Sequence, residues 1–219
     1  MKEIEYKKYK RVLIFTAHPD DLEGFAGGLI SLLANNAKVY SVIFSEGDRG
    51  RWEKKFREIN KIDFEDLRVS EAQEAKAILK FNYVETLGFD DRKINENKLN
   101  VYTVLEHIKL IKPDLVLSFE FNKVFNFYSH PDHIAVGKCV RDAVKIYKNC
   151  DYFTFTTLRP NYYIDIEEVR GTKMSALACH KTQRKLNKII FPFLEFLPDK
   201  TVGFLTGSKF AEGYRRVTI

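Results

Sequence analysis

Short, almost uninterrupted apolar runs alternate along this chain with longer stretches whose apolar residues recur at helical spacing. The apolar runs are RVLIFTA (11–17), KVYSVIFS (38–45), NYVETLG (82–88) and DLVLSF (114–119), and the helical stretches are LEGFAGGLISLLANN (22–36), LRVSEAQEAKAILK (67–80) and LNVYTVLEHIKLIK (99–112). Strands that are apolar along their whole length are buried on both faces, as in parallel sheets covered by helices. The pattern predicts a Rossmann-like α/β fold, with a mostly parallel sheet and helices on both of its faces.

The last third of the chain has a different pattern. Two strand-like runs lie close together, DYFTFTTL (151–158) and NYYIDI (161–166), before a predicted helix around residues 173–190 and a tail from residue 210. We expect this part to add strands and a helix that close the site. The chain has 219 residues and shows no repeat or flexible linker, so the prediction is a single domain over residues 1–219.

Charge and cysteine content narrow the class of protein. The net charge of +6 comes from basic and acidic residues mixed along the chain, which favours a solvated surface over nucleic-acid binding. An odd set of cysteines (Cys139, Cys150, Cys179) without a CxxC pair favours the reducing cytoplasm. No signal peptide is expected, and no apolar run reaches the ~20 residues of a membrane span. The apolar segment IIFPFLEFL (189–197) could touch a membrane surface, but a core segment or a homo-oligomer contact is preferred.

The first predicted strand leads directly into TAHPDDLE, which contains His18, Asp20 and Asp21. Ligands of parallel α/β sheets bind beyond the carboxyl ends of the strands, which is where this motif falls. A dinucleotide-binding protein would have a GxGxxG turn at this position, and this chain has none. Taken alone, the motif could simply start a helix, since proline and aspartate are favoured in a first helical turn.

A second cluster of the same kind follows the strand DLVLSF. The stretch FNFYSHPDHIAVG contains His130, Asp132 and His133, so three of the five histidines lie in the two clusters. Both clusters are expected at one edge of the sheet, where adjacent buried carboxylates repel each other unless a cation neutralises them. Together they predict a metal site to which both clusters contribute ligands.

These motifs resemble a known family. AHPDDLEGFAGG and SHPDHIAVG are similar to the two signature motifs of the LmbE/PIG-L family of zinc-dependent N-acetylglucosaminyl deacetylases. The resemblance covers nearly the whole chain, and KMSALACHKTQ and FAEGYR resemble C-terminal segments of the bacillithiol-pathway type. The chain departs from the family after the second strand, where SEGDRGRW replaces a T-x-G-E-like turn.

The resemblance implies a metal-dependent amidohydrolase that deacetylates an N-acetylglucosamine-containing small molecule or glycoconjugate. It implies one zinc ion per chain, held by His18, Asp21 and His133, with Asp20 as the general base. His130 would stabilise the carbonyl oxygen, and Asp132 could hydrogen-bond to His130 and fix its tautomer. Whether Asp20 or His130 protonates the leaving amine stays open.

Substrate contacts are less clearly marked. By resemblance Arg68 would face the substrate, with a surface salt bridge as the alternative. Glu46 and Asp91 lie in loops after predicted strands, Asp91 being equally explained by turn propensity, and Lys173 could line the site or only a helix face. The aromatic residues Phe125, Phe127 and Tyr128 could stack on a sugar or pack under their loop. Other functions remain open: hydrolysis of another amide, or a catalytically silent sugar-binding module.

Overall fold

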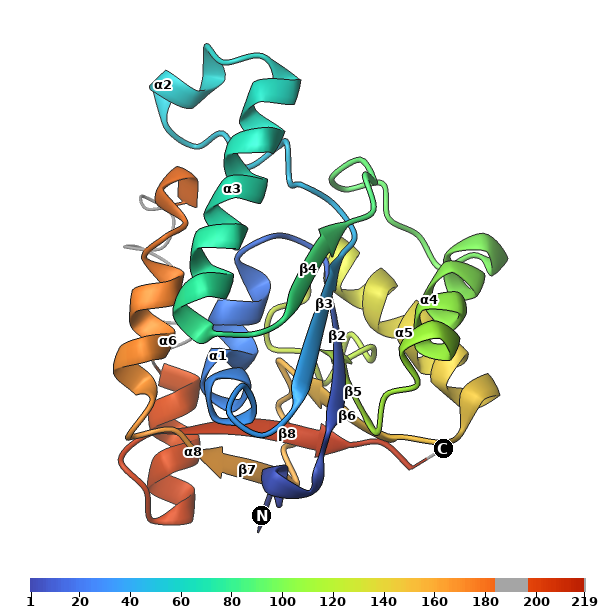
Figure 1. Cartoon of the computed structure of the whole chain (residues 1–219), viewed down its shortest axis with the longest axis vertical. Coiled ribbons are helices and arrows are strands. Elements are labelled where there is room, and N and C mark those ends of the chain that lie inside the picture. Colours follow the sequence, from blue (N-terminus) through green and yellow to red (C-terminus); the bar gives the residue numbers. More distant parts are fainter. Residues whose placement is uncertain (184–196, 219) are drawn as a thin grey trace.

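A sheet of eight strands crosses the middle of the computed structural model, which describes residues 1–183 and 197–218 (Figure 1). The strand order is β1-β7-β8-β6-β5-β2-β3-β4. The strands are β1 (Lys2–Glu3), β2 (Arg11–Thr16), β3 (Lys38–Ile43), β4 (Tyr83–Thr86), β5 (Leu115–Phe119), β6 (Asp151–Phe155), β7 (Tyr162–Asp165) and β8 (Ala211–Arg216).

Most neighbouring strands run parallel. β2 pairs in parallel with both β3 and β5, and β4 and β6 extend the sheet in parallel on either side. β8 is antiparallel to both of its neighbours, β6 and β7. The prediction of a mostly parallel Rossmann-like sheet with extra C-terminal strands is therefore confirmed. The carboxyl ends of β2, β5 and β6 lie at one edge.

Helices cover both faces of this sheet. On one face α1, α3 and α6 pack together, and α4 packs against α5 on the other (Figure 1). The α-helices are α1 (Asp21–Leu33), α2 (Lys54–Arg57), α3 (Lys61–Leu79), α4 (Lys98–Ile111), α5 (Pro131–Tyr147), α6 (Arg170–Leu177) and α8 (Leu197–Thr206), and the 3-10 turns are η1 (Tyr6–Lys8) and η2 (Lys181–Gln183). Helix α8 packs against β8.

Two helix boundaries differ from the sequence prediction. Helix α3 starts at Lys61, six residues before the predicted start at Leu67, because the side chain of Asn60 accepts a hydrogen bond from Asp63 N and caps it. The helix predicted around residues 173–190 is wrong as a continuous element, because α6 ends at Leu177. Thr182 N and Oγ1 instead donate to the Glu71 carboxylate, which draws the backbone away from helical bonding.

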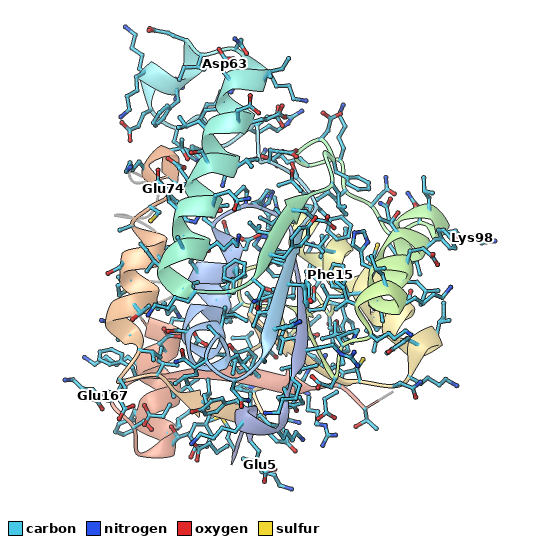
Figure 2. The ribbon with its side chains drawn as sticks, in the orientation of Figure 1. Glu5, Phe15, Asp63, Glu74, Lys98 and Glu167 are labelled. Carbon is cyan, nitrogen blue, oxygen red and sulfur yellow. The ribbon has the colours of Figure 1, made fainter. Side chains whose placement is uncertain are left out.

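The core lies around β2. Phe15 is fully buried at the centre of the molecule, whereas the labelled side chains of Asp63 and Lys98 lie at the periphery (Figure 2). Within residues 1–183 and 197–218, no helix has the length and apolar character needed to cross a membrane. The apolar segment 189–197, considered for a subunit contact, lies outside the described residues except for Leu197 at the start of α8.

Helix α5 lies unusually close to β5. A Cβ added to Gly137 would lie 2.6 Å from the carbonyl oxygen of Phe119, so only glycine fits at this crossing. The close contact fixes α5 against the carboxyl end of β5. It thereby also fixes His133, which lies one helical turn before Gly137.

A buried ionic cluster joins α1, α6, α8 and β8. Lys173 Nζ lies 2.7 Å from Asp199 Oδ2 and 2.9 Å from Glu212 Oε1. Glu212 also accepts hydrogen bonds from the backbone amides of Gly28 (2.8 Å) and Leu29 (2.9 Å). Lys173, which the sequence marked as a candidate substrate contact, is only 1% exposed. Its geometry supports a structural role, because two buried carboxylates already hold its ammonium.

We expect Lys173→Met to lower the free energy of unfolding by about 3–5 kcal/mol, because it leaves Asp199 and Glu212 buried without their cation. Lys181→Met is the matched control, since Lys181 is exposed and only 3.4 Å from the exposed Glu74. Its effect should stay below about 1 kcal/mol. Urea unfolding of both variants measures the difference. Equal losses in the free energy of unfolding would show that the buried cluster contributes no more to stability than the exposed ion pair.

Candidate metal centre

The turn between β2 and α1 positions the first histidine-aspartate cluster. Asp21 Oδ2 accepts hydrogen bonds from Ala17 N (3.1 Å) and His18 N (2.7 Å). These bonds close the turn around the carboxylate and bring His18 Nδ1 to 3.6 Å from the same oxygen. Both side chains are buried. The local sequence therefore holds an imidazole and a carboxylate side by side.

The start of α5 positions the second cluster. Pro131 occupies the first turn, where its fixed φ suits a helix and its missing N–H is not needed. His130 caps this helix, with Nδ1 accepting a hydrogen bond from Asp132 N at 3.3 Å. The buried ring of His133 stacks on Phe119, the last residue of β5, with centroids 3.9 Å apart. The cap and the stacking hold both rings in place.

The two clusters meet at the carboxyl ends of β2 and β5. The ring centroids of His18 and His130 lie 5.1 Å apart, those of His130 and His133 5.1 Å, and those of His18 and His133 5.6 Å. His133 Nε2 lies 3.1 Å from Asp21 Oδ1. One nitrogen from each of the three histidines lies within 4.8 Å of the others, a spacing that could hold a metal ion.

Two further carboxylates face the other side of the His18 ring. His18 Nε2 lies 3.4 Å from Asp91 Oδ1 and 3.4 Å from Asp132 Oδ2, and these three groups also lie within 4.8 Å of one another. Backbone amides fix both carboxylates, since Arg49 N donates to Asp91 (3.2 Å) and Arg92 N donates to Asp132 (2.7 Å). The loops after β3 and β4 thus help to build the centre.

The charges around His18 favour a bound cation. Burial alone would lower the pKa of His18, but the carboxylates of Asp132, Asp21 and Asp91 outweigh burial and raise its pKa well above the ordinary value. Burial likewise opposes ionisation of Asp91, yet His18 brings the pKa of Asp91 down to about 2. Three carboxylates therefore converge on one imidazole, a surplus of buried negative charge that a metal ion would neutralise.

Polar atoms in the centre also lack partners. His18 Nε2, His133 Nδ1 and Asp132 Oδ1 are buried, and none has a hydrogen bond within the part of the chain that the structure describes. Burial first, and then the charges of His133 and His18, lower the pKa of His130 to about 4, so its ring is neutral at pH 7. Neutral imidazole nitrogens and carboxylate oxygens are the donors that zinc uses. The residues present therefore fit a divalent metal ion.

Asp20 is the N-cap residue of α1 and is partly exposed. Its Oδ1 accepts a hydrogen bond from Arg68 Nη2 at 2.9 Å, and Arg68 Nη1 donates to Gly47 O at 2.9 Å. Gly47 has a φ of +72°, and a Cβ at that position would overlap the Arg68 guanidinium. Arg68, predicted to face the substrate, is only 2% exposed, so its geometry supports holding Asp20 and the loop after β3.

A family model described as GlcNAc-PI de-N-acetylase (PIG-L) matches residues 13–144, which contain both clusters and more than half of the chain. The chain belongs to the PIG-L family. The resemblance drawn from its two motifs is therefore confirmed.

Two relatives of this PIG-L protein are named as deacetylases. The diacetylchitobiose deacetylase of Thermococcus kodakarensis is 24% identical over 97% of this chain and 85% of the relative. The probable N-acetyl-α-D-glucosaminyl L-malate deacetylase 2 of Bacillus subtilis is 28% identical over 80% of this chain and 83% of the relative. The solved N,N'-diacetylchitobiose deacetylase of Pyrococcus horikoshii, 21% identical, has a TM-score of 0.87 over 97% of this chain and 85% of that structure. It shows that the fold is shared.

The structure shows where Asp132 and Glu46 lie relative to the PIG-L centre. Asp132 could have hydrogen-bonded to the His130 side chain, but its carboxylate lies beside His18 and only its backbone N reaches His130. Asp132 lies in the first turn of α5, and its carboxylate contacts His18 Nε2 and Arg92 N. Glu46 is half-buried in the loop after β3 and is not among the groups that surround His18.

Phe25 borders this PIG-L centre but was not predicted from the sequence as part of it. Its ring centroid lies 6.0 Å from His133, 6.0 Å from Tyr128 and 6.4 Å from Phe127. The available signal was its spacing, because residues four apart share one face of a helix and Phe25 lies four residues after Asp21. Tyr128 also packs against His133, at 5.0 Å. An aromatic wall thus borders the centre.

Proposed function

We propose that this protein is a zinc-dependent hydrolase that removes the acetyl group from an N-acetylglucosamine moiety. The observation that supports the proposal is the convergence of the two clusters, which brings His18, Asp21, His130 and His133 together, while the partly exposed Asp20 directly precedes Asp21 in the sequence. A binding module would need no such carboxylate beside the metal ligands. The named activities of the two deacetylase relatives support the same reaction.

His18, Asp21 and His133 would hold one zinc ion per chain. When bound, zinc supplies a water molecule of lowered pKa and polarises the amide carbonyl. Asp91 and Asp132 flank His18 Nε2 and would orient the ring toward the metal, as carboxylates next to metal-binding histidines commonly do. Asp21 is itself oriented by the amides of Ala17 and His18.

Asp20 and His130 would handle the protons. Asp20 accepts a proton from the attacking water, and its hydrogen bond from Arg68 holds it in position. Nδ1 of His130 accepts a hydrogen bond from the backbone, so the proton of the neutral ring is on Nε2. That N–H can donate to the carbonyl oxygen as negative charge develops there. We assign delivery of the proton to the leaving amine to Asp20.

The test combines metal analysis with amine release. Purified protein should contain zinc, and it should release acetate and a free amine from N-acetylglucosamine and its glycosides in equal amounts. Removing the metal with a chelator should stop the reaction, and zinc should restore it. Zinc without deacetylation of any sugar would favour another amide or a silent binding module, and acetate release without metal would refute the zinc mechanism.

The role of Asp91 can be tested against its neighbour. We expect Asp91→Asn to weaken metal affinity by about 10–100-fold, the usual effect of losing a carboxylate that orients a histidine ligand. Asp90→Asn is the control, because Asp90 is exposed and paired with Lys61 and Lys93. Competition with a chromophoric chelator measures both, and equal affinities would mean that Asp91 does not position His18.

We further propose that residues 1–219 form one domain that works in the cytoplasm. The single domain is supported by a sheet that joins strands from both ends of the chain. The cytoplasmic location rests on the free cysteines Cys139, Cys150 and Cys179. A homo-oligomer is a proposal to be tested by the mass of the protein in solution.

A further inference from the structure

The short segment after α6, residues 180–183, takes no part in the mechanism described above, yet its side chains His180, Thr182 and Gln183 are buried. They contact three different parts of the fold: His180 Nε2 lies 3.2 Å from Glu23 Oε2 of α1, Thr182 Oγ1 donates to Glu71 Oε2 of α3 at 2.6 Å, and Gln183 Nε2 donates to Gly50 O in the loop after β3 at 3.0 Å. Buried polar groups are costly unless they are hydrogen-bonded, so these contacts hold the segment in one place.

Two of these contacts lie one helical turn from the salt bridge between Asp20 and Arg68. Glu23 follows Asp20 by three residues at the start of α1, and Glu71 follows Arg68 by three residues on α3. Residues three apart are neighbours on a helix surface. The segment therefore joins α1 to α3 next to the groups that position the proposed base.

The third contact, from Gln183, reaches the loop that holds Arg68. Gly47 O accepts hydrogen bonds from Arg68 Nη1 at 2.9 Å and from Gly50 N at 3.0 Å, so residues 47–50 form a turn that presents this oxygen to the guanidinium. A Cβ added to Gly50 would lie 2.7 Å from Gln183 Nε2 and 3.0 Å from Arg68 Nη1. Gln183 and Arg68 therefore pack against the same piece of backbone.

The orientation of Arg68 depends on this turn. Its Nε is buried and has no hydrogen-bond partner within residues 1–183 and 197–218. The guanidinium is instead oriented by the bonds from Nη1 to Gly47 O and from Nη2 to Asp20 Oδ1. If the turn shifts, Nη1 loses its acceptor, and the guanidinium is free to rotate away from Asp20.

We propose that Gln183 is a positioning residue for the reaction. Its hydrogen bond to Gly50 O fixes the turn 47–50, the turn fixes Arg68, and Arg68 holds Asp20 where it can take a proton from water. Gln183 is not one of the groups that meet at the metal centre, so its effect on turnover passes through the base. The proposal rests on the proposed deacetylase function and adds a residue from the last third of the chain to its machinery.

The test is a double-mutant cycle, measured by amine release from N-acetylglucosamine and its glycosides. Gln183→Met removes the donor and keeps an unbranched side chain of similar length. We expect kcat to fall about 10-fold. A base displaced by ~1 Å can cost about 100-fold, but Asp91 still anchors the loop by accepting a hydrogen bond from Arg49 N at 3.2 Å. KM and zinc content should stay within about 2-fold of the wild-type values.

The second arm of the cycle separates positioning from a general loss of structure. In an Asp20→Asn background, Gln183→Met should leave kcat unchanged, because no base remains to be positioned. A purely structural role would lower kcat by the same factor in both backgrounds. If Gln183→Met does not fold, Gln183→Glu takes its place in the cycle, since a carboxylate has nearly the same shape and cannot donate to Gly50 O.

Gln73→Met is the matched control, because Gln73 is exposed on α3 and its substitution should change none of these quantities. Several results would overturn the positioning role: full activity of Gln183→Met, an equal fall in kcat in both backgrounds, a change confined to KM or zinc content, or the same response in Gln73→Met. Absence of amine release by the zinc-loaded wild type would instead refute the deacetylase function, and the positioning role with it.

Discussion

Asp20→Asn should lower kcat by about 10²–10⁴-fold and leave the zinc content unchanged, because it removes a general base but no metal ligand. Asparagine has nearly the same shape as aspartate, and its carbonyl oxygen can still accept the hydrogen bond that Arg68 Nη2 donates at 2.9 Å. The turn should therefore keep its structure, while the side chain can no longer take a proton from water. The loss should appear in kcat more than in KM.

The control for Asp20→Asn is Asp90→Asn. It removes the same charge from an exposed side chain that lies 2.7 Å from Lys61 and 2.9 Å from Lys93. Activity is measured by amine release and zinc by elemental analysis of the same preparations. Full activity of Asp20→Asn would exclude Asp20 as the base, and loss of zinc together with activity would make it a metal ligand.

His133→Phe should weaken zinc binding by at least ~100-fold, because it removes one of the three proposed ligands. Losing a ligand should cost more affinity than losing a group that only orients a ligand. Phenylalanine is chosen because the His133 ring stacks on Phe119 at 3.9 Å, and a phenyl ring can keep that packing. The variant should fold, with unfolding behaviour close to that of the metal-free wild type. Chelator competition measures the affinity.

A histidine outside the centre serves as control for His133→Phe. His107, on α4, lies 2.6 Å from Glu85 and edge-on to Phe15, and it contributes to neither group of metal-binding side chains. His107→Phe should bind zinc as the wild type does. If His133→Phe also retains wild-type affinity while folded, His133 is not a ligand, and Asp91 and Asp132 become the candidates to hold a metal with His18.

The fold could be predicted because its signal is local and repeated. Each apolar run of the parallel sheet is short, and each is followed by a helical stretch, so the layers follow from periodicity alone. The meeting of His18 with His133 could also be predicted, because both follow strands whose carboxyl ends share an edge. The order of strands at the other edge could not, since nothing in the sequence of β8 marks it as lying between β6 and β7.

The finer parts of the site depend on which way a side chain turns. Asp90 and Asp91 are adjacent and chemically identical, yet Asp91 is 6% exposed beside His18 while Asp90 is exposed beside two lysines. A loop has no periodicity from which to predict this difference. The contacts of Arg68 could not be predicted for a related reason, because its guanidinium bonds to Asp20 and to Gly47 O, which no local pattern marks.

The position of β8 determines the order in which the strands can join the sheet during synthesis. β8 lies between β6 and β7, and β7 in turn pairs with β1, so residues 2–3 can join the rest of the sheet only after β8 has been synthesised. The strands β2 to β6 and both histidine clusters can assemble earlier, from the amino-terminal side, as growing chains generally do. A nascent chain that ends before residue 211 would have both halves of the metal centre but would lack Glu212, which holds the amide of Gly28 in α1. Synthesis of residues 211–216 is therefore the step that allows the sheet to close.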